Sequence, residues 1–182
     1  MALMTLLPST LAGYAARTAV TAALLICSLR NHLPGRDVIC KALAWGGPAG
    51  LAVFVLWILP EQFDWRWYKS WCMLGEGGTT GLGSTSARDL PLLAVRLTGS
   101  AFVIAVAEEL FFRKWLIGFA GFWWMTALFA LEHDRYVVGA IAGVAYGALY
   151  LRHGLGSAIV AHIVTNLTLG IWVLMTGQWQ FW

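Results

Sequence analysis

Hydrophobic residues in this chain come in six long runs, separated by shorter stretches of polar and turn-forming residues. The runs cover about residues 10–29, 42–59, 90–107, 119–132, 136–151 and 155–176. Most of them are near the length of about 20 residues that crosses a bilayer as an α-helix. The pattern predicts an all-α fold, a polytopic transmembrane bundle of about six helices.

Two features of these runs predict how the helices extend and pack. No glycine or proline interrupts residues 110–117, so we expect the third helix to continue to about Gly118. In the fifth run, small residues recur at four-residue spacing, at Gly139, Gly143 and Gly147. Such a face lets a second helix approach closely, so we assign these glycines to packing.

The longest polar connection covers residues 61–89. Its first part, residues 63–71, mixes aromatic and basic side chains as membrane-interface belts do, and residues 75–86 are rich in glycine, serine and threonine. We interpret the connection as a surface-lying segment, with a lid or a substrate rim as the alternative. His32 and His153 fall in shorter connections, and we expect both at the surface.

Composition supports a membrane location for the whole chain. Hydrophobic residues make up 59% and charged residues 12% of the 182 positions, and the mean hydropathy is +0.70, whereas a soluble domain carries about 25% charged residues. These values predict a single integral membrane domain over residues 1–182. The net charge of +3 comes from scattered basic residues, so we expect no nucleic acid partner and take the lipid bilayer as the surroundings.

Three charged residues stand near the end of the third run: Glu108, Glu109 and Arg113. Each such charge costs roughly 2.5–3.5 kcal/mol at the middle of a bilayer unless it is paired or hydrated. Because Glu109 and Arg113 are four residues apart, they share a helix face and predict an intrahelical ion pair. Glu108 is rotated from Glu109 by about 100° and therefore needs another polar group.

Later runs supply polar groups that can meet Glu108. His133 follows Phe129 by four residues, and Asn166 follows His162 by four. Counting a rise of about 1.5 Å per residue from the expected helix ends places Glu108 and both histidines at overlapping depths. We therefore predict that side chains from several helices line one hydrated cavity.

These groups suit a hydrolytic reaction. A carboxylate beside a neutral imidazole can hold and deprotonate water, and a second imidazole with an amide can stabilise an oxyanion. No serine or cysteine is placed with a base and an orienting group, which argues against a covalent triad. Water is the expected nucleophile.

Three motifs in this order resemble those of the CPBP family of intramembrane proteases, the CAAX proteases and bacteriocin-processing enzymes. They are Glu108-Glu109-x-x-x-Arg113, Phe129-x-x-x-His133 and His162-x-x-x-Asn166. The resemblance covers about residues 90–174, which predicts a protease-like core there. Residues 111–113 and the turn within 146–156 are also similar to the CAAX-protease-related branch found beside exosortase systems.

The resemblance implies an intramembrane endopeptidase that acts on a membrane-associated peptide or protein. Carried over by position, Glu108 and His133 would activate water, while His162 and Asn166 would stabilise the oxyanion. Supporting roles would fall to Glu109, Arg113 and Phe129.

The resemblance leaves the chemistry of the family open, because its members have been described both as metalloproteases and as glutamic proteases. This chain has no H-E-x-x-H motif, and an ion-paired Glu109 is a poor metal ligand. We therefore expect a glutamic-type enzyme with no metal or other cofactor, and keep a metalloendopeptidase-like zinc enzyme as the alternative.

Location and two rival functions complete the expectations. The expected location is the bacterial inner membrane, as an integral protein. One rival is a non-catalytic membrane partner, such as an immunity or assembly factor, whose polar cluster locks the helices together. The other is a proton- or ion-coupled transporter, a common use of intramembrane carboxylates and histidines.

Overall fold

The computed structural model describes residues 11–29, 36–63, 68 and 90–181, and this part of the chain contains helices and no strand. Five helices stand alone: α2 (Leu11–Leu29), α3 (Arg36–Gln62), α8 (Phe122–Leu131), α9 (Tyr136–His153) and α10 (Leu155–Thr176). Residues 90–120 form a sixth, which we call the rod. The all-α prediction of about six helices is confirmed.

The rod is one continuous helix built from five segments. They are α5 (Leu90–Thr98), η2 (Gly99–Ile104), α6 (Ala105–Glu109), η3 (Leu110–Leu116) and α7 (Ile117–Ala120). The predicted continuation past residue 107 is therefore confirmed. The rod ends before Gly121, whose φ of 80° is a backbone conformation open mainly to glycine.

The segments η2 and η3 are π-helical and lie on either side of α6. A π segment bonds each N–H to the carbonyl five residues back, and such segments are frequent at functional sites. Nothing in the hydrophobic pattern predicts them. Their position brackets the two adjacent carboxylates, Glu108 and Glu109.

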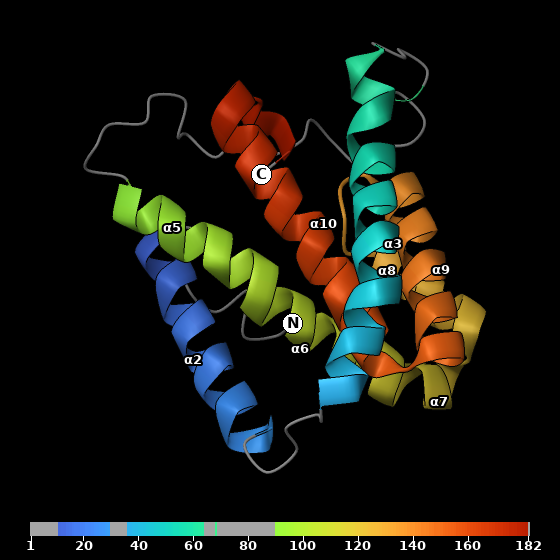
Figure 1. Ribbon diagram of the computed structural model, residues 1–182. Coiled ribbons are helices and arrows are strands. Elements are labelled where there is room, and N and C mark those ends of the chain that lie inside the picture. Colours follow the sequence, from blue (N-terminus) through green and yellow to red (C-terminus); the bar gives the residue numbers. More distant parts are fainter. Residues whose placement is uncertain (1–10, 30–35, 64–67, 69–89, 182) are drawn as a thin grey trace.

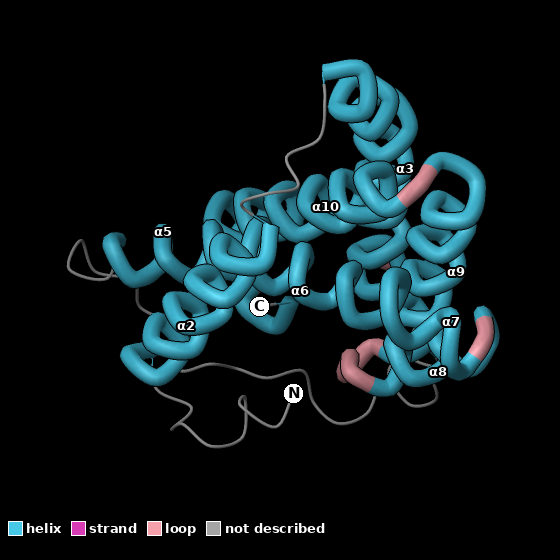
Figure 2. The backbone as a smooth tube through the Cα atoms, turned by 90° about the horizontal axis from the view of Figure 1, so that it is seen from below, coloured by secondary structure: helices cyan, strands magenta, loops and turns pink. Residues whose placement is uncertain are grey.

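Helix α10 is central to the bundle. It packs along α3 and also contacts α9, the rod and the short helix η4 (Trp179–Phe181). Figure 1 shows α2 crossing α5 on one side of α10, and Figure 2 shows α7, α8 and α9 grouped on the other. The Glu108–Glu109 part of the rod thereby faces α10.

Two helices, α3 and α10, are long and apolar enough to cross a bilayer, and shorter apolar helices cover Gly13–Cys27 and Phe122–Leu131. Large hydrophobic side chains remain exposed on these helices, including Leu24, Trp45, Trp123 and Met175. Lipid chains would cover such surfaces without a free-energy cost, whereas their exposure to water would be unfavourable. The expected interfacial segment or lid lies outside the described residues, apart from Glu61–Phe63 and Tyr68.

The glycines of α9 face α8, as their spacing predicts. A Cβ at Gly147 would come 2.7 Å from the ring of Phe122, and one at Gly143 would come 3.2 Å from the ring of Phe129. The two helices therefore approach closely only because these positions carry no side chain.

One expectation about the connections is wrong. His153 closes α9 instead of lying in a loop, and its half-buried ring stacks on Trp45 of α3 with 4.2 Å between ring centroids. The stack joins the end of α9 to the first half of α3. His32 lies outside the described residues.

A matched pair of glycines tests the packing of α3 on α10. A Cβ at Gly46 would lie 2.5 Å from the Ser157 carbonyl oxygen and 2.8 Å from Val160 Cβ, whereas a Cβ at Gly47 would meet nothing within 4 Å. Gly46→Ala should therefore lower the free energy of unfolding by about 1–3 kcal/mol through overpacking. Gly47→Ala should be neutral or stabilise by up to about 1 kcal/mol.

Reversible unfolding of the two variants in detergent micelles, followed by circular dichroism, measures this difference. Equal effects of both substitutions would contradict the close contact between α3 and α10.

Candidate active site

A buried ion pair between Glu109 and Arg113 packs against the site. Arg113 Nη1 lies 3.1 Å from Glu109 Oε1, and both side chains are fully buried. The guanidinium carbon lies 4.2 Å from the centroid of the Phe129 ring, and Nη2 donates to the Gly143 carbonyl at 3.4 Å. A cation over an aromatic face gains further stabilisation. The structure thus contains the ion pair that the spacing predicts, with Phe129 packed against it.

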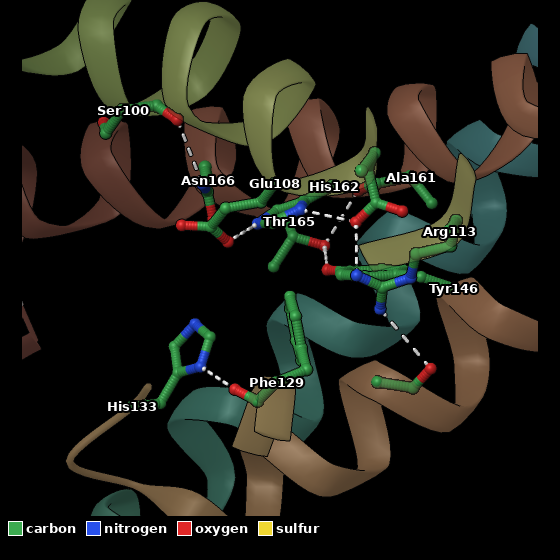
Figure 3. Close-up of polar contacts among 12 residues, drawn as sticks. Ser100, Glu108, Arg113, Phe129, His133, Tyr146, Ala161, His162, Thr165 and Asn166 are labelled. Carbon is green, nitrogen blue, oxygen red and sulfur yellow. Dashed lines mark hydrogen bonds and ion pairs between the residues drawn. The ribbon is translucent and has the colours of Figure 1, made fainter. Parts of the chain in front are cut away.

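His162 of α10 joins the two carboxylates. Its Nδ1 lies 2.8 Å from Glu109 Oε1, and its Nε2 lies 3.8 Å from Glu108 Oε2. The ring is buried and stacks on Tyr146 with 4.9 Å between centroids. Figure 3 shows the imidazole beside the Glu108 carboxylate. The ion pair, through Glu109, therefore holds His162 in place.

Asn166 lies one helical turn after His162 and reaches the rod. Its Nδ2 donates to the Ser100 carbonyl at 3.1 Å (Figure 3). The same carbonyl accepts the N–H of Ala105, which is the i+5 bond of the π segment η2. An amide nitrogen carries two hydrogens, so one N–H of Asn166 remains for a ligand.

His133 approaches from the turn that joins α8 to α9. Its Nδ1 lies 2.8 Å from the Phe129 carbonyl, and its ring meets the edge of Trp57 at 5.3 Å. Burial lowers the pKa of His133, against the opposing effect of the Glu108 charge. A neutral ring whose Nδ1–H donates to the carbonyl presents Nε2 as an acceptor.

These side chains surround one cavity of about 290 Å³. Its polar lining includes Ser100, His133, His162 and Asn166, and its apolar lining includes Trp57, Phe129, Leu169 and Phe181. The Glu108 carboxylate lies beside it, on the far side of the His162 ring from Glu109. The volume is close to the lower end of ligand sites, about 300 Å³.

The structure shows which imidazole lies nearest to Glu108. We expect Glu108 and His133 to activate water together, and within the described part of the chain the direct contact of Glu108 is with His162. His133 lies apart from Glu108 (Figure 3). The charge of Glu108 acts to raise the pKa of His133, but no hydrogen bond joins the two side chains. The space between them is where a water molecule could bridge both groups.

The comparisons with known proteins agree with this arrangement. A family model described as "Rce1-like: Type II CAAX prenyl endopeptidase Rce1-like" matches residues 90–168, a segment that holds all three motifs. This segment, less than half of the 182 residues, is similar to an Rce1-like domain. The resemblance to CAAX proteases is thereby confirmed, while the finer likeness to the exosortase-associated branch stays a prediction. Curated proteins and solved structures gave no match.

The match supports a membrane-embedded endopeptidase in general terms. The two long apolar helices, α3 and α10, fit an integral membrane location. Only α10 belongs to the Rce1-like domain, and α3 packs on it from outside the matched segment. The predicted bounds of the core, about 90–174 within a single domain, stay a prediction.

Several residues of the Rce1-like domain that shape the site were missed from the sequence. Tyr146 donates to Thr165 Oγ1 at 2.7 Å, and that oxygen also lies 2.9 Å from the Gly50 carbonyl of α3. Thr165 follows His162 by three residues, so its place on the same helix face could have been found. Ser100 acts through its backbone and has no signal in the sequence.

Two more residues, Glu132 and Arg135, lie in the turn beside His133. Arg135 pairs with Glu61 at the end of α3, donates to the Gln180 carbonyl at 3.0 Å and lies over the Phe181 ring. These contacts fix the turn to α3 and η4 at the rim of the cavity. Glu132 is half-buried and lines the cavity itself.

The donor set of the Rce1-like domain does not fit a metal ion in this conformation. Among the described residues, no three His, Cys, Asp or Glu side chains are arranged to hold one. Glu109 is engaged by Arg113 and His162, and zinc sites usually take three or four protein ligands. We therefore derive no catalytic step through a metal.

Proposed function

We propose that this protein is an intramembrane endopeptidase that hydrolyses a peptide bond of a membrane-associated peptide or protein. The observation that carries the proposal is the convergence of polar side chains from separate elements on one cavity in an otherwise apolar bundle. His133 from the α8–α9 turn and His162 and Asn166 from α10 line this cavity, and Glu108 from the rod lies 3.8 Å from His162. Placing four polar side chains together inside an apolar bundle has a free-energy cost, which a bundle with a purely structural role would avoid.

Glu108 is the general base of this proposal. The Glu109 carboxylate is already bound by Arg113 and His162, whereas Glu108 has only the longer contact with His162 among the described residues. A less engaged carboxylate is free to take a proton from water. His133, with Nε2 directed away from its carbonyl partner, would hold that water from the opposite side.

His162 and Asn166 form the proposed oxyanion site. Asn166 offers its second amide hydrogen, and His162 offers Nε2–H if Nδ1–H is the hydrogen bound by Glu109. The imidazole then carries both hydrogens, and its positive charge lies between the two carboxylates. With Arg113 included, two positive and two negative charges balance inside the apolar bundle.

The substrate we propose is a peptide segment held at the membrane, such as a leader peptide or a C-terminal sorting signal. The lining combines the aromatic rings of Trp57, Phe129 and Phe181 with the polar groups of the site, which suits an apolar peptide. The proposed setting is the bacterial inner membrane, following the resemblance to bacterial members of this family. The proposed mechanism is of the glutamic type and needs no metal.

A cleavage assay with the purified chain in lipid vesicles tests this function. The substrates are a set of membrane-anchored peptides with a quenched fluorophore pair. His162→Ala should lower kcat by about 10²–10³-fold, the cost of losing an oxyanion donor. Treatment with EDTA or 1,10-phenanthroline should leave the wild-type rate unchanged.

Three results would overturn the proposal or part of it. Equal cleavage by wild type and His162→Ala would point to a contaminating protease. Loss of activity on chelation, restored by zinc, would replace the glutamic mechanism with the metal-dependent one. Absence of cleavage, with biological activity retained by Glu108→Ala, would favour a non-catalytic membrane partner.

A further inference from the structure

We propose that Glu132 is a second catalytic carboxylate, which in its protonated form donates a proton to the leaving amine nitrogen. This inference rests on the proposed function and divides its chemistry between two groups. Glu108 removes a proton from water, and Glu132 supplies one to the other product.

The place of Glu132 in the fold brings it to the reacting bond. It ends α8 and directly precedes His133 in the chain. It lines the same cavity as His133, His162 and Asn166, and it comes from the α8–α9 turn and not from α10, which carries the oxyanion donors. An amide whose oxygen is bound by α10 can therefore present its nitrogen to a group of this turn.

Glu132 is also free of the contacts that engage other acidic groups. None of the described residues gives its carboxylate a hydrogen bond or an ion pair. Both nearby arginines are occupied, Arg113 by Glu109 and Arg135 by Glu61. A half-buried carboxylate without a described partner has no evident structural purpose.

Charge balance around the cavity favours the protonated form. Within the described part of the chain, the other titratable side chains around the cavity and its rim are Glu61, Glu108, Glu109, Arg113, His133, Asp134, Arg135, Tyr146 and His162. Asp134 is exposed, and the arginines are paired. Among the described residues, an ionised Glu132 would therefore add a negative charge with no unpaired arginine or lysine side chain beside it, close enough to Glu108 for the two charges to repel each other.

Two carboxylates in one poorly hydrated site rarely ionise together. Burial, followed by the charge of Glu108, raises the pKa of Glu132 to about 7. A substantial fraction of Glu132 thus carries its proton near neutral pH. That is the range in which a general acid works best.

The proposed steps balance as follows. Water oxygen forms a bond to the amide carbon, and one water proton moves to Glu108. The carbon–nitrogen bond then breaks as the Glu132 proton passes to the departing nitrogen. The products are a carboxylic acid and an amine, and the proton on Glu108 returns to Glu132 through water or His133, which restores the starting state.

Activity as a function of pH gives the first test. Glu132→Gln, which cannot donate in this way, should lower kcat by about 10²–10³-fold, and Glu132→Asp should recover part of that loss. The wild-type kcat should fall as pH rises through about 7, because each further unit lowers the protonated fraction about tenfold. This alkaline decline should be absent from Glu132→Gln. The matched control, Asp37→Asn, changes an exposed carboxylate in the first turn of α3, the opposite end from Glu61.

Infrared difference spectroscopy gives a second test that does not depend on cleavage. The carbonyl band of a protonated carboxylic acid should titrate near pH 7 in the wild type and disappear in Glu132→Gln. In Glu108→Gln, where the like charge is gone, the same band should titrate at lower pH. This reading works even if the natural substrate is not among the peptides tried.

The two tests separate failure of this inference from failure of the proposed function. If wild type cleaves, Glu108→Gln does not, and Glu132→Gln keeps the wild-type rate and pH profile, Glu132 is not the acid. A protonated-acid band unchanged in Glu132→Gln would overturn the inference too. If wild type fails to cleave and Glu108→Ala keeps full biological activity, the proposed function falls and takes the role of Glu132 with it, whatever the spectra show.

Discussion

Glu108→Gln should abolish peptide cleavage while the helical bundle stays folded. The amide keeps the size and polarity of the side chain but cannot accept a proton from water, and loss of a general base costs about 10²–10⁴-fold in rate. Glu108 is only partly buried, and its described contact is the 3.8 Å approach to His162. The substitution therefore removes little that stabilises the fold.

Single-turnover cleavage in vesicles, alongside thermal unfolding, measures this separation of activity from stability. Asp37→Asn again serves as the control, because it removes one carboxylate at an exposed position. A variant that cleaves at more than about one tenth of the wild-type rate would remove Glu108 from the role of base. A variant that loses the helical signal would show instead that Glu108 supports the bundle.

Arg113→Met should destabilise the protein more than other single changes in the bundle. The guanidinium and the Glu109 carboxylate are both fully buried, and removing one partner of such a pair costs about 3–5 kcal/mol because a charge is left uncompensated. The loss also removes the cation that lies over Phe129. The free energy of unfolding in detergent micelles measures the effect.

A second substitution and a neighbour provide the controls. Replacing Glu109 as well, in Glu109→Met/Arg113→Met, should recover part of the lost stability, since no unpaired charge of the pair remains. Activity should stay low, because His162 then lacks the carboxylate that binds its Nδ1. Lys114→Met removes an exposed charge next in the chain and should change stability by less than about 0.5 kcal/mol. If Arg113→Met matched Lys114→Met, the pair would be of little structural value.

The two predictions assign different roles to the adjacent residues Glu108 and Glu109. Glu108 and Glu109 are neighbours in sequence, yet one contacts the site loosely and the other is locked between Arg113 and His162. Glu108→Gln should lower the cleavage rate with little change in stability. Arg113→Met, which removes the partner of Glu109, should mainly lower the stability. Such a division is physically reasonable, since a base must be free to take a proton and a supporting charge must not move.

Sequence alone determined the secondary structure and the identity of most polar residues in the site. Long apolar runs set the helices because membrane-length stretches without charge have few other stable forms. The ion pair followed from the four-residue spacing of Glu109 and Arg113, which is a local property of any α-helix. The glycine face of α9 was readable for the same reason.

Tertiary structure alone decided which groups meet. Whether His133 or His162 lies next to Glu108 depends on the rotation and tilt of α8 and α10. A count of residues along each helix gives neither the rotation nor the tilt. The Ser100 carbonyl that holds Asn166 belongs to a π segment without a sequence pattern, and Glu132 became a candidate only once its neighbours' charges were seen to be paired. Local spacing is encoded within one helix, whereas contacts between helices arise from the packing of the whole bundle.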